Sequence, residues 1–225
     1  MPTIHTAVIF DFDGTIIDTE WPDYSAFQRV HRDHGLPPIP LARWQSTIGL
    51  ADNALSVDFT AELLAQRPGI DEGEIHLKRR RYRDSLIAAE QTRAGVKEWV
   101  DHASTNDLPL GVASSSSPEW VLGHLERIGL LSYFDHVEGT SHGQTGKPAP
   151  DVYLRCASAL DANPLETVAI EDSPHGASAA LAAGMSCIAV PNRITAGARF
   201  DPDAYHLSSL GDADPTDWLL TRERR

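Results

Sequence analysis

Cysteine is too rare in this sequence to build a disulfide framework. The 225 residues include two cysteines, Cys156 and Cys187. Both lie in apolar stretches, where a free cysteine is typically a small buried hydrophobic residue rather than a reactive one. The sequence therefore excludes the small, disulfide-rich class of secreted domain.

Long hydrophobic runs are also missing. The chain has no run of 18 apolar residues, and its N-terminus lacks the charged and apolar regions that make up a signal peptide. We therefore expect a cytoplasmic protein that does not bind a membrane.

Basic residues are outnumbered by acidic ones. Lysine and arginine together number 19, against 32 aspartates and glutamates, so the formal net charge is −13. This excess argues against binding to nucleic acid or to an anionic membrane surface, because both need basic protein surface. An anionic substrate would need a locally positive site.

The composition is that of a folded globular chain, with 41% hydrophobic and 23% charged residues. Apolar runs that predict buried strands occur at residues 6–12, 108–114, 167–172 and 186–191, with a weaker one at 136–139. Patterns that predict helices lie between them, at about 95–105, 118–129, 150–161 and 174–183. This alternation predicts an α/β fold with a doubly wound parallel sheet covered on both faces.

One segment near the N-terminus departs from this alternation. It contains helical patterns at residues 24–35, 51–66 and 71–90 and little strand signal. We predict a catalytic core made of residues 1–17 and 90–225, with residues 18–89 inserted after the first strand as a helical cap. Such an insertion would form a lid over the carboxyl ends of the strands, where these sheets bind ligands.

Polar side chains gather where the predicted strands end. Asp11 and Asp13 follow the first strand, serines 114–116 follow the second, and Glu171 and Asp172 end the strand at 167–172. Lys147 lies in the loop before the helix at 150–161. Because parallel strands end at one edge of a sheet, these residues can converge there.

The charges of this group suggest a metal site. Asp11, Asp13 and Asp172 would carry three negative charges, which Lys147 and a divalent cation would balance. Carboxylates together with substrate phosphate oxygens are the ligands that Mg²⁺ prefers. A site of this kind stabilises phosphoryl transfer by positioning and by charge compensation.

Each motif taken alone also has a simpler explanation. An Asp-x-Asp-Gly segment can be an ordinary turn. The serines can be a loop that leads into a helix, with Ser117 as the N-cap ahead of Pro118. A single lysine in a loop is commonly solvated. The functional interpretation therefore depends on the four motifs occurring together.

The four motifs occur in a specific order: DFDGT, a hydrophobic strand that ends in serine, a lysine before proline, and a strand that ends in EDS. In this order they strongly resemble the haloacid dehalogenase superfamily of phosphotransferases. The helical insertion after DFDGT resembles the subfamily of β-phosphoglucomutase and phosphoglycolate phosphatase. The resemblance covers nearly the whole chain and implies a Rossmann-like core, a cap and Mg²⁺ as cofactor.

The resemblance also implies roles for single residues. Asp11 would be the nucleophile that forms an aspartyl-phosphate, and Asp13 would be the general acid and then the general base. Ser114 would bind the phosphoryl group together with the backbone N–H groups of Gly14 and Ser115.

The remaining implied roles concern charge. Lys147 would hold the nucleophile and the phosphoryl oxygens. Asp172 and Glu171 would hold Mg²⁺ beside Asp11 and the backbone carbonyl of Asp13.

Two residues and one loop segment narrow the type of reaction that this protein is expected to catalyse. Asp13 argues against dehalogenation, because a halide leaves without a proton. The cap histidine of the sugar phosphomutases is replaced here by Asp23. The segment at 46–53, the counterpart of the mutase lid loop, lacks the basic residues of that loop. We therefore predict a phosphomonoesterase that acts on a small sugar or polyol phosphate, as a monomer or weak dimer. A sugar phosphomutase and a non-catalytic binding relative are the alternatives.

Specificity is expected to come from the cap. The candidate substrate contacts are Trp21, Asp23, Arg43 and Gly49, with Trp44 as a further one, although core packing is the competing explanation for both tryptophans. The basic stretch at residues 78–83 either solvates a helix face or captures the substrate anion.

Overall fold

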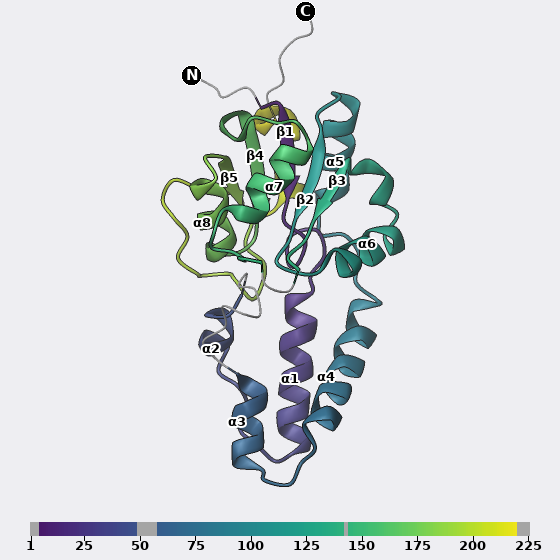
Figure 1. Ribbon diagram of the computed structural model, residues 1–225, viewed down its shortest axis with the longest axis vertical. Coiled ribbons are helices and arrows are strands. Elements are labelled where there is room, and N and C mark those ends of the chain that lie inside the picture. Colours follow the sequence, from purple (N-terminus) through teal and green to yellow (C-terminus); the bar gives the residue numbers. More distant parts are fainter. Residues whose placement is uncertain (1–4, 49–57, 142–143, 220–225) are drawn as a thin grey trace, which may run out of the picture.

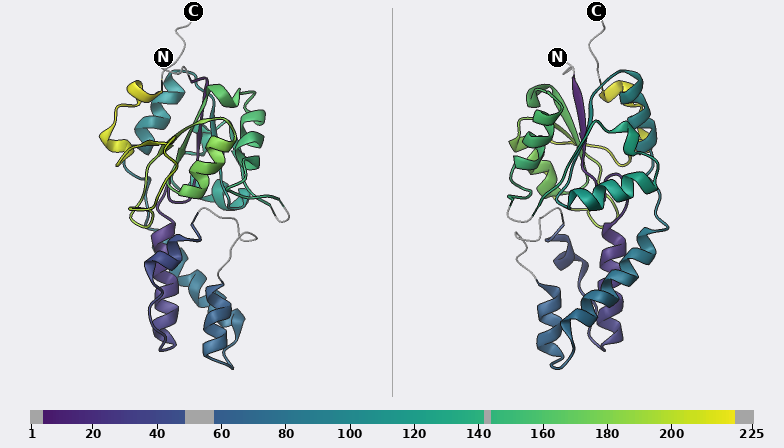
Figure 2. Two further views of the ribbon diagram at one scale, coloured as in Figure 1. Left: turned by 90° about the vertical axis from the view of Figure 1, so that its left-hand side faces the viewer. Right: turned by 45° about the vertical axis from the view of Figure 1, so that its right-hand side comes forward.

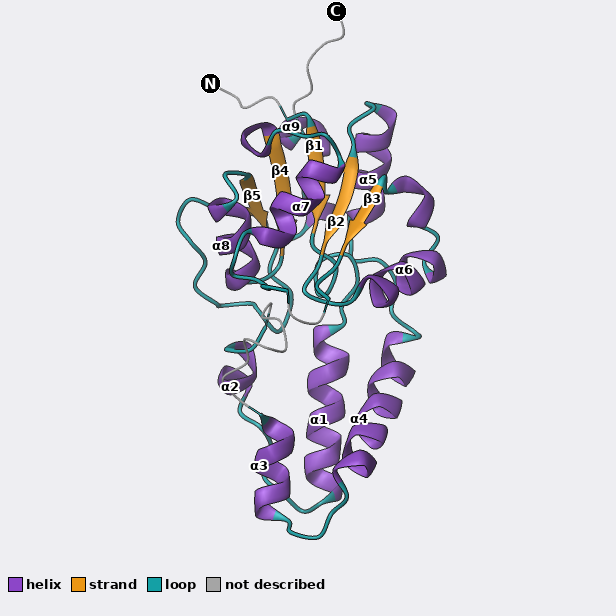
Figure 3. Ribbon diagram, viewed as in Figure 1, coloured by secondary structure: helices purple, strands orange, loops and turns teal. Residues whose placement is uncertain are grey.

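The structure is a computed structural model that describes residues 5–48, 58–141 and 144–219. Its centre is a parallel sheet with strand order β3-β2-β1-β4-β5-β6, of which Figure 3 labels β1 to β5. The strands are β1 (Ala7–Phe10), β2 (Leu110–Ala113), β3 (His136–Glu138), β4 (Thr167–Glu171), β5 (Ser186–Ala189) and β6 (Tyr205–His206). β1 lies at the centre, paired with β2 on one side and β4 on the other.

The alternation of side chains along β1 divides the core into two layers. Val8 and Phe10 point to one face of the sheet and Ile9 to the other. All four residues of β1 are fully buried, as expected for a central strand with both faces covered. The fold class predicted from the sequence is thereby confirmed.

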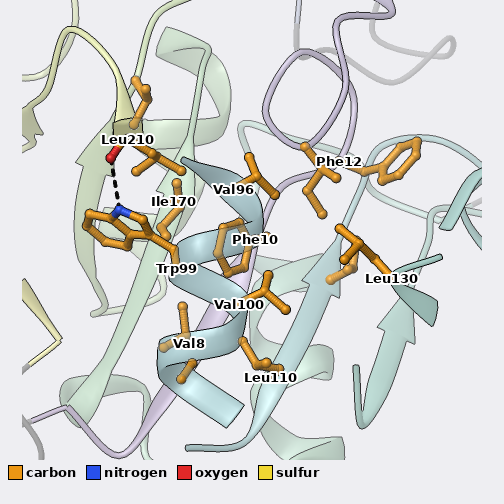
Figure 4. Close-up of a cluster of buried hydrophobic side chains, with 14 of the residues drawn as sticks. Val8, Phe10, Phe12, Val96, Trp99, Val100, Leu110, Leu130, Ile170 and Leu210 are labelled. Atoms are coloured by element: carbon orange, nitrogen blue, oxygen red, sulfur yellow. Dashed lines mark hydrogen bonds between the residues drawn. The ribbon is translucent and has the colours of Figure 1, made fainter. Parts of the chain in front are cut away.

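Helices cover both faces of the sheet (Figure 2). The face of Val8 and Phe10 packs against α5 (Val96–Thr105), α6 (Pro118–Arg127) and α9 (Pro215–Trp218). The face of Ile9 packs against α7 (Asp151–Ala159) and α8 (Pro174–Ala182). In the first layer, Trp99 of α5 lies over the strands and donates its indole N–H to the carbonyl of Leu210 at 3.1 Å (Figure 4).

Between β1 and α5, four of the described helices extend away from the carboxyl edge of the sheet (Figure 1). They are α1 (Glu20–Asp33), α2 (Leu41–Gln45), α3 (Phe59–Gln66) and α4 (Glu72–Ile87), and α1 packs along α4. An aromatic cluster of Phe27, Trp44 and Phe59 joins α1, α2 and α3. None of the described helices is both long and apolar enough to cross a membrane.

The chain enters and leaves this helical segment at one place. Ile17 and Thr92 form an antiparallel bridge, and the backbone N–H of Arg93 donates to the carbonyl of Ile16 at 2.8 Å. The Arg93 guanidinium donates to the carbonyls of Gly14 at 2.5 Å and Pro191 at 3.0 Å. The two connecting segments are therefore fastened to each other and to the edge of the sheet.

Several elements differ from the expectation, among them the short helices α2 and α9, which were not predicted. β6 was not predicted, because two residues are too short to show alternation and it forms only by pairing with β5. The helical pattern expected at residues 51–66 becomes a helix only from Phe59, and residues 49–57 lie outside the described part. The other predicted strands and core helices are confirmed within a few residues.

Candidate active site

The predicted residues meet at the carboxyl edge of the sheet, beside β1. From β1 the chain builds β2 and β3 on one side and later returns to place β4 on the other. This reversal opens a crevice at the strand ends, which is where α/β sheets bind ligands. Asp11 and Asp13 follow β1, Ser114 follows β2, and Glu171 is the last residue of β4.

Lys147 is a fully buried lysine that links two of the acidic residues. Its ammonium donates to Asp11 Oδ1 at 2.5 Å and to Glu171 Oε1 at 2.6 Å, and its side chain is 1% exposed. An ammonium group that is buried away from water needs carboxylate partners of this kind, because burial of an isolated ion is very costly in free energy. The surface-lysine explanation is therefore excluded for Lys147.

The pKa values in this group show how strongly its charges depend on one another. Burial opposes the charge on Lys147, but the attraction of Asp11 and Glu171 outweighs it and raises the pKa of Lys147. Burial and the negative charge of Glu171 raise the pKa of Asp11 to about 7, against the opposing attraction of Lys147. The site thus holds more negative charge than Lys147 alone can offset.

Glu171 has both carboxylate oxygens occupied by the protein. Its Oε1 accepts hydrogen bonds from Lys147 and from the hydroxyl of Tyr153, the latter at 2.7 Å. Its Oε2 accepts from the backbone N–H groups of Asp172 and Ser173, at 3.1 and 3.2 Å, and from the Ser173 hydroxyl. In this arrangement Glu171 orients Lys147 toward Asp11.

Gly176 makes the position of Glu171 possible. A Cβ atom added at Gly176 would overlap the Glu171 carboxylate, whereas one added at Gly123, also inside a helix, would meet nothing within 4 Å. Glycine at position 176 is therefore required for the close approach of α8 to β4.

We expect Gly176→Ala and Gly123→Ala to have opposite effects on stability. Alanine is favoured over glycine inside a helix, so Gly123→Ala should raise the free energy of unfolding by about 0.5–1 kcal/mol. Gly176→Ala should lower it by about 1–3 kcal/mol, because the overlap displaces Glu171. Urea unfolding of both variants measures this. A gain for both substitutions would show that Gly176 does not support Glu171.

Asp172 is the third buried acidic residue, and Gly14 allows it to approach the loop after β1. Asp172 accepts from the Thr15 hydroxyl at 3.3 Å and from Asn192 Nδ2 at 2.7 Å. Gly14 has φ +85°, and a Cβ there would overlap Asp172 Oδ2. The Gly14 N–H donates to the Ile17 carbonyl at 2.8 Å. The prediction that this N–H binds phosphate is therefore wrong in this structure, and Gly14 serves as a close-approach glycine.

The acidic cluster fits a divalent cation. Asp11, Glu171 and Asp172 are all buried, and each offers an oxygen within 4.8 Å of the others. Asp11 Oδ2 is buried without a hydrogen-bond partner among the described residues, although a buried carboxylate oxygen normally has one. Three carboxylates against one ammonium also leave two negative charges to be compensated.

Asp13 is held by four hydrogen-bond donors. Its Oδ1 accepts from the Thr19 hydroxyl and from the Trp120 indole N–H, both at 2.9 Å. Its Oδ2 accepts from the hydroxyls of Ser114 at 3.2 Å and Ser116 at 2.7 Å. Sequence reasoning missed Thr19, Ser116 and Trp120 as partners, because nothing in the motif spacing shows which side chains face Asp13.

The serine loop after β2 both supplies a side chain to the site and begins helix α6. Ser114 is fully buried at the strand end, and Ser115 follows it in the same loop. Ser117 accepts from the backbone N–H of Trp120 at 3.3 Å, and Pro118 is the first residue of α6. The prediction that Ser117 caps this helix is thus confirmed.

The loop after β1 offers two backbone donors that sequence reasoning missed. Among the described residues, none accepts a hydrogen bond from the backbone N–H of Phe12 or Asp13. These groups lie directly beside Asp11 in the chain. They are therefore better candidates than Gly14 for binding phosphate oxygens, since an unpaired N–H is available to an anion.

A cavity of about 830 Å³ lies between the sheet edge and the helical segment. Its floor includes Asp11, Asp13, Ser114 and Asp172. Helices α1–α4 and the loops beside them contribute side chains of mixed character to its wall, which include Glu20, Asp23, Phe27, Trp44, Asp58, Phe59, His76, Arg79 and Arg83. A cavity of this size holds a metabolite rather than a macromolecule.

The predicted cap contacts divide into those that reach the cavity and those that do not. Asp23 and Trp44 line it. Arg43 instead pairs with Glu62 at the surface, at 2.6 Å. Trp21 is exposed, with the Arg193 guanidinium 4.1 Å above its ring. Neither Trp21 nor Arg43 is part of the described wall.

Two further expectations concern the cap. Gly49 lies outside the described residues. Of the basic stretch at 78–83, Arg79 and Arg83 face the cavity while Arg80 and Arg81 are exposed. Arg79 donates twice to the Asp23 carboxylate, at 3.1 and 2.6 Å. One face of the stretch is therefore solvated and the other turns toward the cavity, whereas capture of a substrate anion by this stretch stays a prediction.

Comparison with known proteins agrees with this geometry. The family model described as haloacid dehalogenase-like hydrolase matches residues 8–190. The chain belongs to this family. The Bacillus subtilis protein YhcW is 35% identical over 92% of this chain and 93% of its own length. Hexitol phosphatase B of Escherichia coli K12 is 32% identical over 82% of this chain and 83% of its own length.

A solved structure shows the same fold. CbbY of Rhodobacter sphaeroides, determined in complex with phosphate, superposes with a TM-score of 0.74 at 25% identity. The match covers 93% of this chain and 96% of that one. With its family and its phosphatase relatives, this member of the haloacid dehalogenase-like hydrolases is a phosphatase, an enzyme that hydrolyses phosphoric monoesters.

Proposed function

We propose that this phosphatase is Mg²⁺-dependent and removes phosphate from a small sugar or polyol phosphate through an aspartyl-phosphate on Asp11. The observation that carries the proposal is the state of Asp11. One of its oxygens is held by buried Lys147, and the other is buried at the floor of the cavity with no hydrogen-bond partner in the part of the chain that the structure describes. An oriented carboxylate with a free oxygen is what nucleophilic attack requires.

In the first step, an oxygen of Asp11 bonds to phosphorus while the bond from phosphorus to the ester oxygen breaks. Asp13 gives its proton to the departing oxygen, which leaves as an alcohol. Ser114 donates a hydrogen bond to the phosphoryl group, as do the backbone N–H groups of Ser115, Phe12 and Asp13. Lys147 offsets charge on Asp11 and on the phosphoryl oxygens throughout.

In the second step, Asp13 is a carboxylate and takes a proton from a water molecule. The water oxygen bonds to phosphorus, and the bond from phosphorus to Asp11 breaks, which releases inorganic phosphate. Asp11 returns as a carboxylate and Asp13 in its protonated form. The net reaction is the hydrolysis of one phosphate ester by one water molecule.

Magnesium would be held by the Asp11 carboxylate, Asp172 and the backbone carbonyl of Asp13, with Glu171 completing the acidic cluster. When bound, it supplies positive charge that stabilises the phosphoryl oxygens during transfer. Each oxygen of Glu171 already accepts two or more hydrogen bonds, whereas each oxygen of Asp172 accepts one from the described residues. We therefore assign the main effect of Glu171 to the orientation of Lys147.

The cavity wall supports the proposed substrate class. Carboxylates of Glu20 and Asp23, paired guanidinium groups and aromatic faces together suit a polyhydroxylated molecule. Hydroxyl groups would donate to the carboxylates, and the apolar rings would face the carbon skeleton. One of the relatives is named hexitol phosphatase B, which supports sugar or polyol phosphates as the substrate class.

We further propose that residues 18–89 form a cap that closes this cavity, with hinges at 16–18 and 91–93.

A screen of phosphorylated metabolites with and without EDTA tests the proposed function. We expect phosphate release from sugar or polyol phosphates, which EDTA abolishes and added Mg²⁺ restores. Undiminished release in EDTA would contradict the metal requirement.

A second assay tests the mutase alternative. The protein is incubated with β-glucose 1-phosphate and its bisphosphate primer, and the products are measured. Formation of glucose 6-phosphate would contradict hydrolysis as the main reaction.

A further inference from the structure

We propose that Trp120 is a positioning residue for Asp13, and that it selects which oxygen of this carboxylate exchanges the proton. The inference rests on the proposed function, because it concerns the residue assigned there as general acid and base. Trp120 is the third residue of α6 and lines the cavity. Its indole N–H donates to Asp13 Oδ1 at 2.9 Å.

The indole ring is fixed by contacts on both α6 and α4. The His124 ring stands against it edge-on, with the ring centroids 4.2 Å apart. The Arg83 guanidinium of α4 lies 4.8 Å from the centre of the same ring. Phe12, the residue between the two aspartates, stacks on His124 in turn. A ring held in this way directs its N–H in one direction, so the hydrogen bond to Asp13 is fixed by packing.

The four partners of Asp13 differ in what they can do when Asp13 carries a proton. Hydroxyl groups can donate or accept, whereas an indole N–H can only donate. Oδ2 faces two hydroxyls, those of Ser114 and Ser116, which can rotate to accept. Oδ1 faces the hydroxyl of Thr19, which can accept, and the indole of Trp120, which cannot. A proton on Oδ1 would lie beside a fixed N–H donor, whereas a proton on Oδ2 has two hydroxyls that can accept it and no fixed donor. The proton of Asp13 is therefore placed on Oδ2, on the side of Ser114, where the phosphoryl group binds in the proposed function.

This orientation matters only when the leaving group needs a proton. An alkoxide from a sugar phosphate is a poor leaving group and depends on the acid, whereas 4-nitrophenolate leaves without one. Loss of the Trp120 N–H should therefore reduce the hydrolysis of alkyl phosphates selectively. A purely structural role of Trp120 would reduce the hydrolysis of both kinds of ester together.

The test compares kcat/KM of Trp120→Phe for p-nitrophenyl phosphate and for an alkyl phosphate. The alkyl substrate is sorbitol 6-phosphate, or the sugar phosphate that the wild type hydrolyses fastest. The ratio kcat/KM reports only the steps up to release of the alcohol, so the second step does not obscure the comparison. Phenylalanine keeps a ring for Arg83 and His124 and removes the N–H.

We expect kcat/KM for the alkyl phosphate to fall about tenfold or more, mainly through kcat, because general acid catalysis contributes 10² or more. For p-nitrophenyl phosphate, kcat/KM of Trp120→Phe should stay within about twofold of the wild-type value. Trp120→Leu should show the same selectivity. Trp99→Phe is the matched control, since it removes an indole hydrogen bond to Leu210 in the core and should leave the ratio of the two values unchanged.

Equal losses for both substrates, or no loss for either, would overturn the role of Trp120 and leave the proposed phosphatase mechanism standing. Failure of the mechanism itself has a different signature, which is normal turnover by Asp11→Asn. The two failures are therefore distinguishable in one set of assays.

Discussion

Asp11→Asn is expected to abolish phosphate release from every substrate, with a fall in kcat of about 10⁴-fold or more, as for other enzymes that lose their nucleophile. Asparagine has nearly the same shape but is a far weaker nucleophile. The loss should extend to p-nitrophenyl phosphate, because even an activated ester needs the attacking carboxylate. Steady-state phosphate release measures the effect.

The substitution should leave the fold intact. Lys147 keeps its ion pair with Glu171 at 2.6 Å, so no buried charge loses all its partners. Circular dichroism and thermal melting verify this. Asp101→Asn is a control for charge alone, since Asp101 is an exposed residue on α5 that pairs with Lys97, and its activity should equal that of the wild type. Near-normal turnover by Asp11→Asn would show that another group attacks phosphorus.

Lys147→Met is expected to lower the free energy of unfolding by about 3–5 kcal/mol, because it leaves buried carboxylates without their cation. Asp11 and Glu171 are 8% and 0% exposed in their side chains, so water cannot replace the ammonium. Methionine fills a similar volume, which confines the change to charge and hydrogen bonding. Activity should also be lost, since Asp11 would no longer be oriented.

Urea unfolding in EDTA measures this cost without a contribution from metal binding. Lys97→Met is the matched control, because Lys97 pairs with Asp101 at the surface, 57% exposed, and surface pairs contribute little. Its unfolding midpoint should not move. Equal stability of Lys147→Met and the wild type would mean that the buried pair is not the source of stability described here.

Much of this fold can be predicted from the sequence because buried parallel strands leave a plain signal. The runs around Val8, Leu110 and Val168 are apolar and short, and their partners in the sheet follow from the α/β alternation. β6 is invisible to this reasoning, since two exposed residues become a strand only by pairing with β5. An apolar run in the sequence therefore predicts a buried strand, but it does not predict a strand that depends on pairing with another one.

The site was predictable to a similar extent. Asp11, Asp13, Ser114 and Asp172 lie at strand ends, so the sheet itself brings them together. Lys147 is in a loop, and its complete burial between two carboxylates depends on how α7 packs, which its sequence neighbourhood does not reveal.

The contacts from helices were the least predictable part. Trp120 reaches Asp13 because α6 starts just after the serine loop and turns that face toward β1. Trp21 and Arg43 looked equally suitable by residue type, but their positions on α1 and α2 direct them to Arg193 and Glu62. Residue type alone does not determine which side of a helix faces a cavity.

The central claim is that Asp11 carries the phosphoryl group, and loss of activity alone does not separate a nucleophile from a metal ligand. Asp13→Asn provides the direct measurement, because it can form the intermediate from p-nitrophenyl phosphate but lacks the base that hydrolyses it. We predict a burst of one nitrophenolate per active site, slow release afterwards, and a phosphoryl group on the peptide that contains Asp11 after acid quenching. Release without a burst, or a phosphoryl group on any other residue, would contradict the mechanism.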